Sequence, residues 1–159
     1  MSRLKKVEAK ETTGKARKIL ESTLSSMGRV PNVFKGMANS PITLQVAVKL
    51  FIAQHRDCAY CVSLYTVVGA NRGMSEAQML DSRRCKSDDA RLGALLQFAR
   101  RMLETKGDVT DGDIADLRAR GYTDEQIAEV VTIIGAMTLG SYFNKMNNTE
   151  LDFPKAPDL

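Results

Sequence analysis

Apolar residues recur at helical spacing along nearly the whole chain, and this pattern limits the fold more than any other feature. Residues 87–107 are the clearest case. An apolar stripe runs between Ser87, which with the two aspartates after it can cap a helix, and Gly107, which can end it. Further helices are expected over residues 12–28, from 42 to about 56, from about 58 to 72, and from residues 75, 111 and 123 onward. The sequence therefore predicts an all-α helical bundle.

The segment 42–56 is the one place where a strand has to be weighed. Residues 44–52 alternate in part between apolar and polar types, but no partner strand is found elsewhere in the sequence. Ser40 and Pro41 precede it, and these residue types cap a helix and occupy its first turn. Because the segment is apolar on most sides, we expect a mostly buried helix.

The length and composition fit one domain. The chain has 159 residues, of which 43% are hydrophobic and 26% charged, and single domains most often contain about 100–150 residues. We find no internal repeat, low-complexity tract or domain-sized linker in the sequence. Residues 1–159 are therefore expected to form a single domain.

The sequence favours a cytoplasmic location. The N-terminal segment MSRLKKVEAKE lacks the apolar core of a secretion signal. The longest apolar run, residues 130–140, is far shorter than the roughly 18 residues that indicate a membrane span. We expect no membrane partner.

A nucleic-acid partner is not expected either, although the net charge is +4 and the pI is about 9.0. Basic residues are interleaved with acidic ones along the chain, which is typical of a solvated surface. Residues 113–131 resemble a helix-turn-helix, but their second helix begins with Asp124, Glu125 and Glu129, which would repel phosphates.

The segment AQHRDCAYC contains the residues most suited to chemistry. Cys58 and Cys61 have C-x-x-C spacing, which can close a small disulfide at the start of a helix, where free N–H groups also favour the thiolate. Asp57 could cap such a helix; alternatively, one helix could run straight through from residue 42. In either geometry His55 is the nearby side chain of a type that accepts protons near neutral pH, so it is the candidate base.

Two other interpretations of the thiols remain open at this point. Free cysteines are often buried as small hydrophobic residues. A zinc site is the second alternative, with Cys85 as a fourth ligand beside His55, Cys58 and Cys61. However, Cys85 stands alone in the sequence, whereas structural zinc ligands usually come in pairs. We therefore expect no bound metal, and we interpret Cys85 as a thiol without a role at the site.

Longer stretches around these residues resemble a known family. Residues 53–78, 94–131 and 142–154 are similar to the alkylhydroperoxidase D-like, or carboxymuconolactone decarboxylase, family, and the similarity extends from about residue 30 to 154. Gln54 and His55 just before C-A-Y-C resemble its peroxidase-related branch. The resemblance implies an all-helical subunit that assembles into homo-oligomers, trimers or hexamers, with the dithiol near a subunit interface.

The resemblance also implies a thiol-dependent oxidoreductase. Cys61 would attack a hydroperoxide, Cys58 would resolve the sulfenic acid into a disulfide, and a thiol reductant would reopen that disulfide at an exposed Cys58. Disulfides are the alternative substrate. The sequence contains no phosphate loop, haem-attachment motif or flavin fingerprint, so no cofactor is expected.

Two positions depart from the family's proton relay. The histidine four residues after the second cysteine is replaced by Tyr65, and the upstream glutamate by Val46. Tyrosine is a poor base at neutral pH, so His55 would have to take the proton, with Tyr65 left to orient a hydrogen bond. The alternative to an enzyme is therefore a family member that lacks the relay and acts as a binding or structural oligomer.

Overall fold

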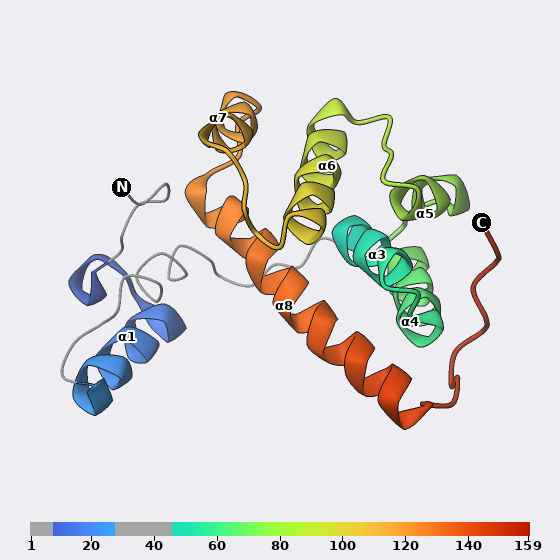
Figure 1. The fold of residues 1–159 in the computed structure, drawn as a ribbon, viewed down its shortest axis with the longest axis horizontal. Coiled ribbons are helices and arrows are strands. Elements are labelled where there is room, and N and C mark those ends of the chain that lie inside the picture. Colours follow the sequence, from blue (N-terminus) through green and yellow to red (C-terminus); the bar gives the residue numbers. More distant parts are fainter. Residues whose placement is uncertain (1–7, 28–45) are drawn as a thin grey trace. The chain divides into compact units, whose positions relative to one another are not determined.

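The computed structural model describes residues 8–27 and 46–159, and these residues form helices and no strand. The chain divides into two compact units, with residues 110–132 grouped with the N-terminal segment and residues 44–109 grouped with 133–159. Figure 1 shows the helices, which are α1 (Gly14–Met27), α3 (Val46–His55), α4 (Ala59–Asn71), α5 (Glu76–Arg83), α6 (Ala90–Glu104), α7 (Asp111–Ala119) and α8 (Asp124–Asn147). The prediction of an all-α fold is confirmed.

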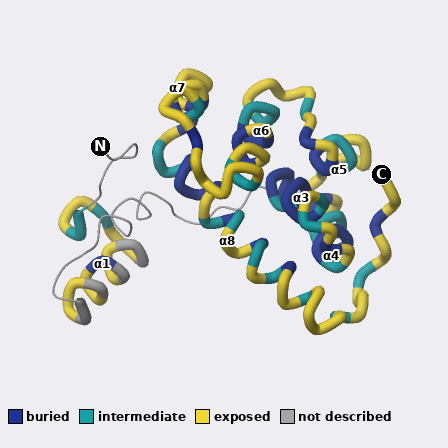
Figure 2. Tube along the Cα trace, viewed as in Figure 1, coloured by how far each residue is buried: buried dark blue, intermediate teal, exposed yellow. Residues whose placement is uncertain are grey.

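Helix α3 is the centre of the unit that contains the cysteines. It packs against α4, α5 and α6, while α4 also packs against α5. Seven of its ten residues are buried, so the helix is dark along most of its length in Figure 2. A helix buried on most sides is what the apolar segment predicts, and the strand alternative is wrong.

The caps of the later helices follow the sequence closely. Ser75 and Gln78 exchange hydrogen bonds at the start of α5, and Thr123 and Gln126 do the same at the start of α8. In α6 the N-cap is Asp89, whose carboxylate accepts hydrogen bonds from two backbone N–H groups of the first turn. These local side-chain bonds determine where each helix begins.

The other unit contains a short 3-10 helix (Ala9–Glu11), α1, α7 and the first turns of α8. In α1, Leu20 is buried, whereas Leu24 is 49% exposed. The expected break between α7 and α8 is present, and Gly121 has a φ of 80°, which favours glycine. The expected end of α1 at Gly28 and the expected cap at Ser40 and Pro41 lie outside the described residues.

Helix α8 belongs to both units and is long and apolar enough, by length and composition, to cross a membrane. Core helices of water-soluble proteins have the same properties, and 39% of its most apolar stretch is buried inside the protein. Its second half also carries four exposed large apolar side chains, Leu139, Tyr142, Phe143 and Met146. Residues 148–159, called here the C-terminal tail, follow α8 without helix.

Candidate active site

The two cysteines lie at a break between helices. Helix α3 ends at His55, and α4 begins at Ala59 with Cys58 as its N-cap. The prediction that Asp57 caps this helix is wrong by one residue, because Asp57 has a left-handed φ of 49° and belongs to the turn. Aspartate tolerates this conformation better than most residues. The alternative of one straight helix through this region is also wrong.

The sulfurs of Cys58 and Cys61 are joined in a disulfide, with Cα atoms 5.2 Å apart. As the N-cap, Cys58 accepts a hydrogen bond through its sulfur from the backbone N–H of Cys61, at 3.2 Å. The two residues are only 2% and 4% exposed. The expectation that Cys58 is open to solvent is therefore wrong, because the tail and the turn before α4 cover it.

Cys61 is adjacent to the second half of α8. The side-chain amide of Asn144 donates to its sulfur, at an Nδ2–Sγ distance of 3.5 Å. Two further bonds hold the same part of α8 against the turn before α4: Arg56 Nε donates to Ser141 Oγ, and Lys145 Nζ donates to the Arg56 carbonyl, each at 2.9 Å. Asn144 follows Cys61 by 83 residues, so no local sequence signal indicated it.

Cys58 borders a cavity of about 210 Å³. Its walls come from the last turn of α3, the turn before α4, the first turns of α4, the end of α5 and the tail: Gln54, Asp57, Cys58, Ala59, Val62, Ser63, Arg83 and residues 155–158. Cys61 does not line it. The disulfide thus joins a residue that lines a cavity, Cys58, to one whose sulfur lies beside α8, Cys61.

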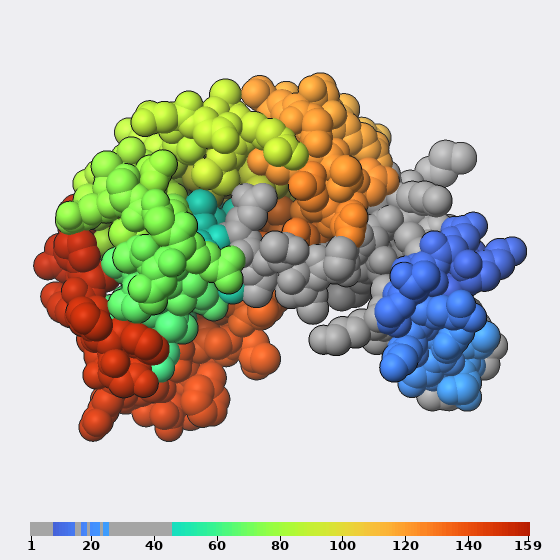
Figure 3. Space-filling model, turned by 180° about the vertical axis from the view of Figure 1, so that it is seen from behind, coloured from blue at the N-terminus to red at the C-terminus, as the bar shows by residue number. Residues whose placement is uncertain are grey.

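The C-terminal tail closes this cavity on one side. The buried hydroxyl of Ser63 accepts a hydrogen bond from the backbone N–H of Ala156, at 3.1 Å. Nearer to α8, the rings of Tyr60 and Phe153 meet edge to face at 5.7 Å. The space-filling view shows the red tail lying against the green surface of α4 and α5 (Figure 3). These contacts bring an extended segment over the first turns of α4.

Arg83, the last residue of α5, links the cavity walls and is 7% exposed. Its Nε donates to Gln54 Oε1 at 2.9 Å, and its Nη1 donates to the Pro157 carbonyl at 2.7 Å. Burial, together with the neighbouring Arg84 charge, lowers the pKa of Arg83, and the negative charge of Asp158 opposes part of this shift. Within the described residues no carboxylate forms an ion pair with this guanidinium. No signal in the sequence indicated Arg83, which lies in an ordinary basic pair.

The structure does not bring His55 into contact with the sulfurs. His55 is the exposed last residue of α3, and its ring contacts that of Phe51, with centroids 5.7 Å apart. No hydrogen bond between described residues joins His55 to Cys58 or Cys61. Any proton exchange between them therefore has to pass through solvent or through a bound substrate.

Tyr65 lies one turn after Cys61 and packs against Val46, Leu50 and Met79. The Lys49 ammonium lies over its ring, 4.7 Å from the centroid. Burial raises the pKa of Tyr65, which makes its proton still harder to release near neutral pH. The two positions that depart from the family's relay, Val46 and Tyr65, thus belong to one apolar cluster.

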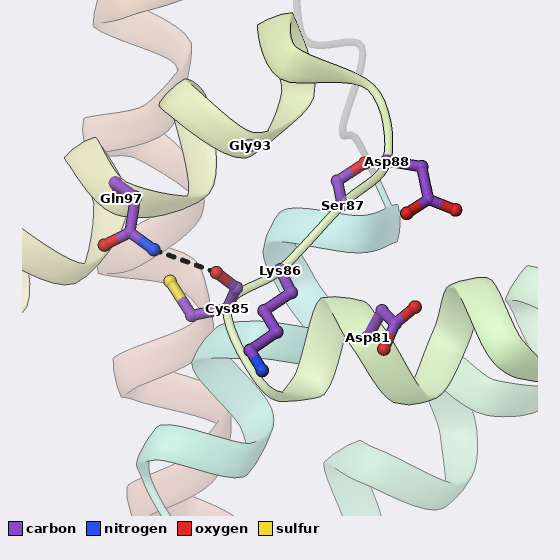
Figure 4. Close-up of a pocket in the computed structure, with 7 residues that line it drawn as sticks. All are labelled: Asp81, Cys85, Lys86, Ser87, Asp88, Gly93 and Gln97. Carbon is purple, nitrogen blue, oxygen red and sulfur yellow. Dashed lines mark hydrogen bonds between the residues drawn. The ribbon is translucent and has the colours of Figure 1, made fainter.

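Cys85 lies elsewhere, in the turn after α5, and is buried with a left-handed φ of 60°. It lines a separate cavity of about 450 Å³ (Figure 4), where Gln97 Nε2 donates to its carbonyl at 2.9 Å. Burial raises the pKa of this thiol, so it is held in its less reactive form. In residues 8–27 and 46–159, no three histidine, cysteine or acidic side chains are grouped to hold a metal ion.

A comparison with family models gives no match, and a comparison with curated proteins gives none either. Solved structures do match. A crystal structure of an uncharacterized peroxidase-related protein from Silicibacter sp. TM1040 has a TM-score of 0.60 and 19% identity, covering 86% of this chain and 84% of that one.

A second crystal structure, described as an alkylhydroperoxidase AhpD core and an uncharacterized peroxidase-related protein from Ralstonia eutropha JMP134, has a TM-score of 0.57. It is 18% identical and covers 98% of this chain and 92% of that one. At 18–19% sequence identity, these structural matches show a shared fold. This result agrees with the family resemblance found in the sequence. The chain therefore has the fold of the alkylhydroperoxidase D-like proteins.

Proposed function

We propose that the protein is a thiol-dependent oxidoreductase that reduces hydroperoxides or disulfides through Cys58 and Cys61. The observation that carries this proposal is the disulfide at the N-terminus of α4, one of whose cysteines, Cys58, lines a cavity. Exchange between a dithiol and a disulfide needs two adjacent sulfurs, stabilisation of a thiolate and access for a second thiol. Peroxidase-related proteins of the same fold support the assignment.

In the proposed cycle, the Cys61 thiolate attacks the peroxide and becomes a sulfenic acid, while the leaving oxygen takes a proton and departs as alcohol or water. The Cys58 thiol then displaces water from the sulfenic acid and forms the disulfide. Cys61 suits the first step because it lies in the first turn of α4 and receives a hydrogen bond from Asn144. The N-terminus of α4 and the Asn144 side-chain amide both stabilise a thiolate more than a thiol.

We assign proton transfer to His55, acting through solvent. Tyr65 is the second candidate, limited to orienting a hydrogen bond, because its ring is packed in the apolar cluster of Val46, Leu50 and Met79. That same cluster favours the second candidate function, a binding or structural oligomer that lacks the relay. Dithiol–disulfide exchange depends on the cysteines themselves, so it would be less affected by the missing relay.

We further propose that the chain forms one domain over residues 1–159 and assembles into a cytoplasmic homo-oligomer, a trimer or hexamer. The structural matches extend over 86% and 98% of the chain, which supports a single domain. Leu139, Tyr142, Phe143 and Met146 recur at helical spacing on α8 and are 57–75% exposed. An apolar helix face of this kind supports self-association. Light scattering after size-exclusion chromatography measures the assembly.

The test of the proposed function is peroxide consumption with dithiothreitol as reductant. Wild-type protein and the variant Cys85→Ser, a matched control for loss of a thiol, should consume peroxide at similar rates, whereas Cys61→Ser should not. Thiol counting before and after one equivalent of hydroperoxide should show the loss of two thiols. If Cys58 and Cys61 stay reduced in folded protein, the oligomer without catalysis is the better assignment.

A further inference from the structure

Among the charged residues that line the cavity beside Cys58, Arg83 is the least exposed, at 7%. We propose that this cavity binds a small thiol reductant that carries a carboxylate, with Arg83 as the anchor of that carboxylate. The inference rests on the proposed dithiol cycle and adds to it the chemical class of the reductant and the residue that selects it.

The hydrogen bonds of Arg83 leave it able to bind an anion. Its Nε is held by Gln54 and its Nη1 by the Pro157 carbonyl, both neutral acceptors. A carboxylate on the guanidinium would form a charge-assisted, bidentate pair that a single carbonyl does not provide. The arginine is therefore held in place without an ion pair among the described residues.

The other charges around the cavity lie at its rim. Asp57 is exposed, and the side chains of Lys155 and Asp158 are 70% and 91% exposed and pair with each other at 3.5 Å. Exposed charges are screened by water and salt, whereas a buried one is screened much less. Burial also lowers the pKa of Arg83, and Asp158 at the rim opposes only part of this shift, so a bound anion would offset more of the lost hydration. The least exposed charge of the cavity therefore favours an anionic ligand.

The size and position of the cavity favour a reductant over a peroxide. Cavities that hold drug-sized ligands measure roughly 300–1,000 Å³, so one of about 210 Å³ suits a small molecule. Cys58 lines this cavity and Cys61 does not. In the proposed cycle peroxide reacts at Cys61, whereas a reductant in the cavity lies next to Cys58, the cysteine that it attacks.

The chemistry at that sulfur balances with two equivalents of the thiol. The thiolate of the first attacks Cys58 Sγ, forms a mixed disulfide and releases the Cys61 thiolate. A second thiolate attacks the sulfur of the bound reductant, which leaves as its own disulfide and frees the Cys58 thiolate. Both protein thiolates then take protons from solvent as their equilibria require. The reductant is oxidised and the protein dithiol restored.

The experiment compares two reductants that differ in charge alone, 3-mercaptopropionate and 3-mercaptopropionamide. Oxidised protein is mixed with each, and release of protein thiols is followed by alkylation and mass spectrometry, with no peroxide present. Each rate is divided by the rate of the same thiol with hydroxyethyl disulfide, which removes differences in intrinsic reactivity. The carboxylate thiol should be about tenfold faster after this correction, because a charged hydrogen bond contributes roughly that factor.

Variants of Arg83 distinguish binding of the carboxylate from a purely structural role of this side chain. Arg83→Gln should reduce the normalised preference to about one, and Arg83→Lys should retain part of it. Arg120→Gln, a matched control at the end of α7 that pairs with Asp116 and does not line the cavity, should leave it unchanged. If Arg83 only held the tail through Pro157, Arg83→Gln would change both rates by the same factor and leave the preference intact. That result, or equal normalised rates in the wild type, overturns the proposal.

A second measurement needs no variant and so does not depend on the folding of Arg83→Gln. At constant ionic strength, propionate should slow the reduction of the wild-type disulfide by 3-mercaptopropionate, whereas propionamide should not. Equal effects of the two compounds on this rate contradict the proposal. Neither measurement involves peroxide. Loss of carboxylate preference therefore counts against the Arg83 site alone, and loss of peroxide consumption counts against the proposed function alone.

Discussion

Cys58 and Cys61 share one disulfide and one turn of chain, yet their surroundings differ. Cys58 borders a cavity with a buried arginine and a wall of C-terminal tail, and its hydrogen-bond donor is a backbone N–H group. Cys61 lies against α8, and its donor is the side chain of Asn144. A dithiol that reacts with two different partners needs such a difference. The C-x-x-C motif itself is nearly symmetric. The difference between the two cysteines therefore comes from segments that are distant in the sequence.

The strongest change should follow from replacing one cysteine at a time. Cys61→Ser should abolish peroxide consumption, because serine supplies no thiolate. Cys58→Ser should also stop turnover, but Cys61 should still be oxidised once, and dimedone should trap its sulfenic acid in a mass spectrum. If dimedone instead labels Cys58 in the Cys61→Ser protein, the roles assigned to the two surroundings are reversed.

The next effect concerns the proton. His55→Ala should slow the peroxide step by about 100-fold, the lower end of what a general base contributes, since His55 contacts neither sulfur. Because His55 is exposed, added imidazole should restore part of the rate. The rate of disulfide reduction at Cys58 should not change, which provides the internal control. An unchanged peroxide rate would remove His55 from the mechanism.

Asn144→Ala should change the reactivity of Cys61 and leave that of Cys58 unaffected. A hydrogen bond to a thiolate contributes roughly 1.5 kcal/mol, which corresponds to about one pKa unit. The pKa of Cys61, measured by iodoacetamide alkylation against pH in a Cys58→Ser background, should rise by about that amount, and the rate at neutral pH should fall with the thiolate fraction. Asn147→Ala, on the same helix and bonded to Thr149, is the matched control.

Ser63→Ala should change access to Cys58 and leave the surroundings of Cys61 unaffected. It removes the acceptor of the Ala156 N–H group, so the tail loses a buried hydrogen bond of about 1 kcal/mol. Hydrogen exchange at Ala156 should speed up severalfold, and reduction of the disulfide by thiols too large for the cavity should become faster. Ser82→Ala, which removes another buried hydroxyl bonded only within α5, should leave both unchanged. Equal effects from the two variants would show that the tail does not limit access.

The sequence predicted local features well and distant ones poorly. Helices were expected from residues 75 and 123 onward, and the structure has both, because Ser75 and Thr123 each cap a helix through a residue three positions away. The N-cap at Cys58 was missed by one residue because the left-handed turn at Asp57 depends on how α3 ends. Asn144, Arg83 and the tail were missed altogether, because helix packing alone brings them to the cysteines.

The weakest change is expected at Tyr65, one turn beyond Cys61 and packed in the apolar cluster with Val46. Tyr65→Phe keeps the ring and should leave peroxide consumption within about twofold of the wild type, because packing supplies most of what a half-buried ring contributes. A clear loss of rate would mean that Tyr65 takes part in proton transfer at Cys61. Unchanged activity would leave Asn144 as the neighbour that distinguishes Cys61.

The same variant has a signature in stability at high pH. Burial raises the pKa of Tyr65, so the unfolded chain releases this proton at a lower pH than the folded protein. The resulting stabilisation is fully present below the unfolded value near 10 and is lost as the pH rises through the folded value. Melting temperatures at pH 8 and pH 11 should therefore differ less for Tyr65→Phe than for the wild type. Equal differences would mean that the Tyr65 hydroxyl reaches water, which would place the hydroxyl outside the apolar cluster of Val46, Leu50 and Met79.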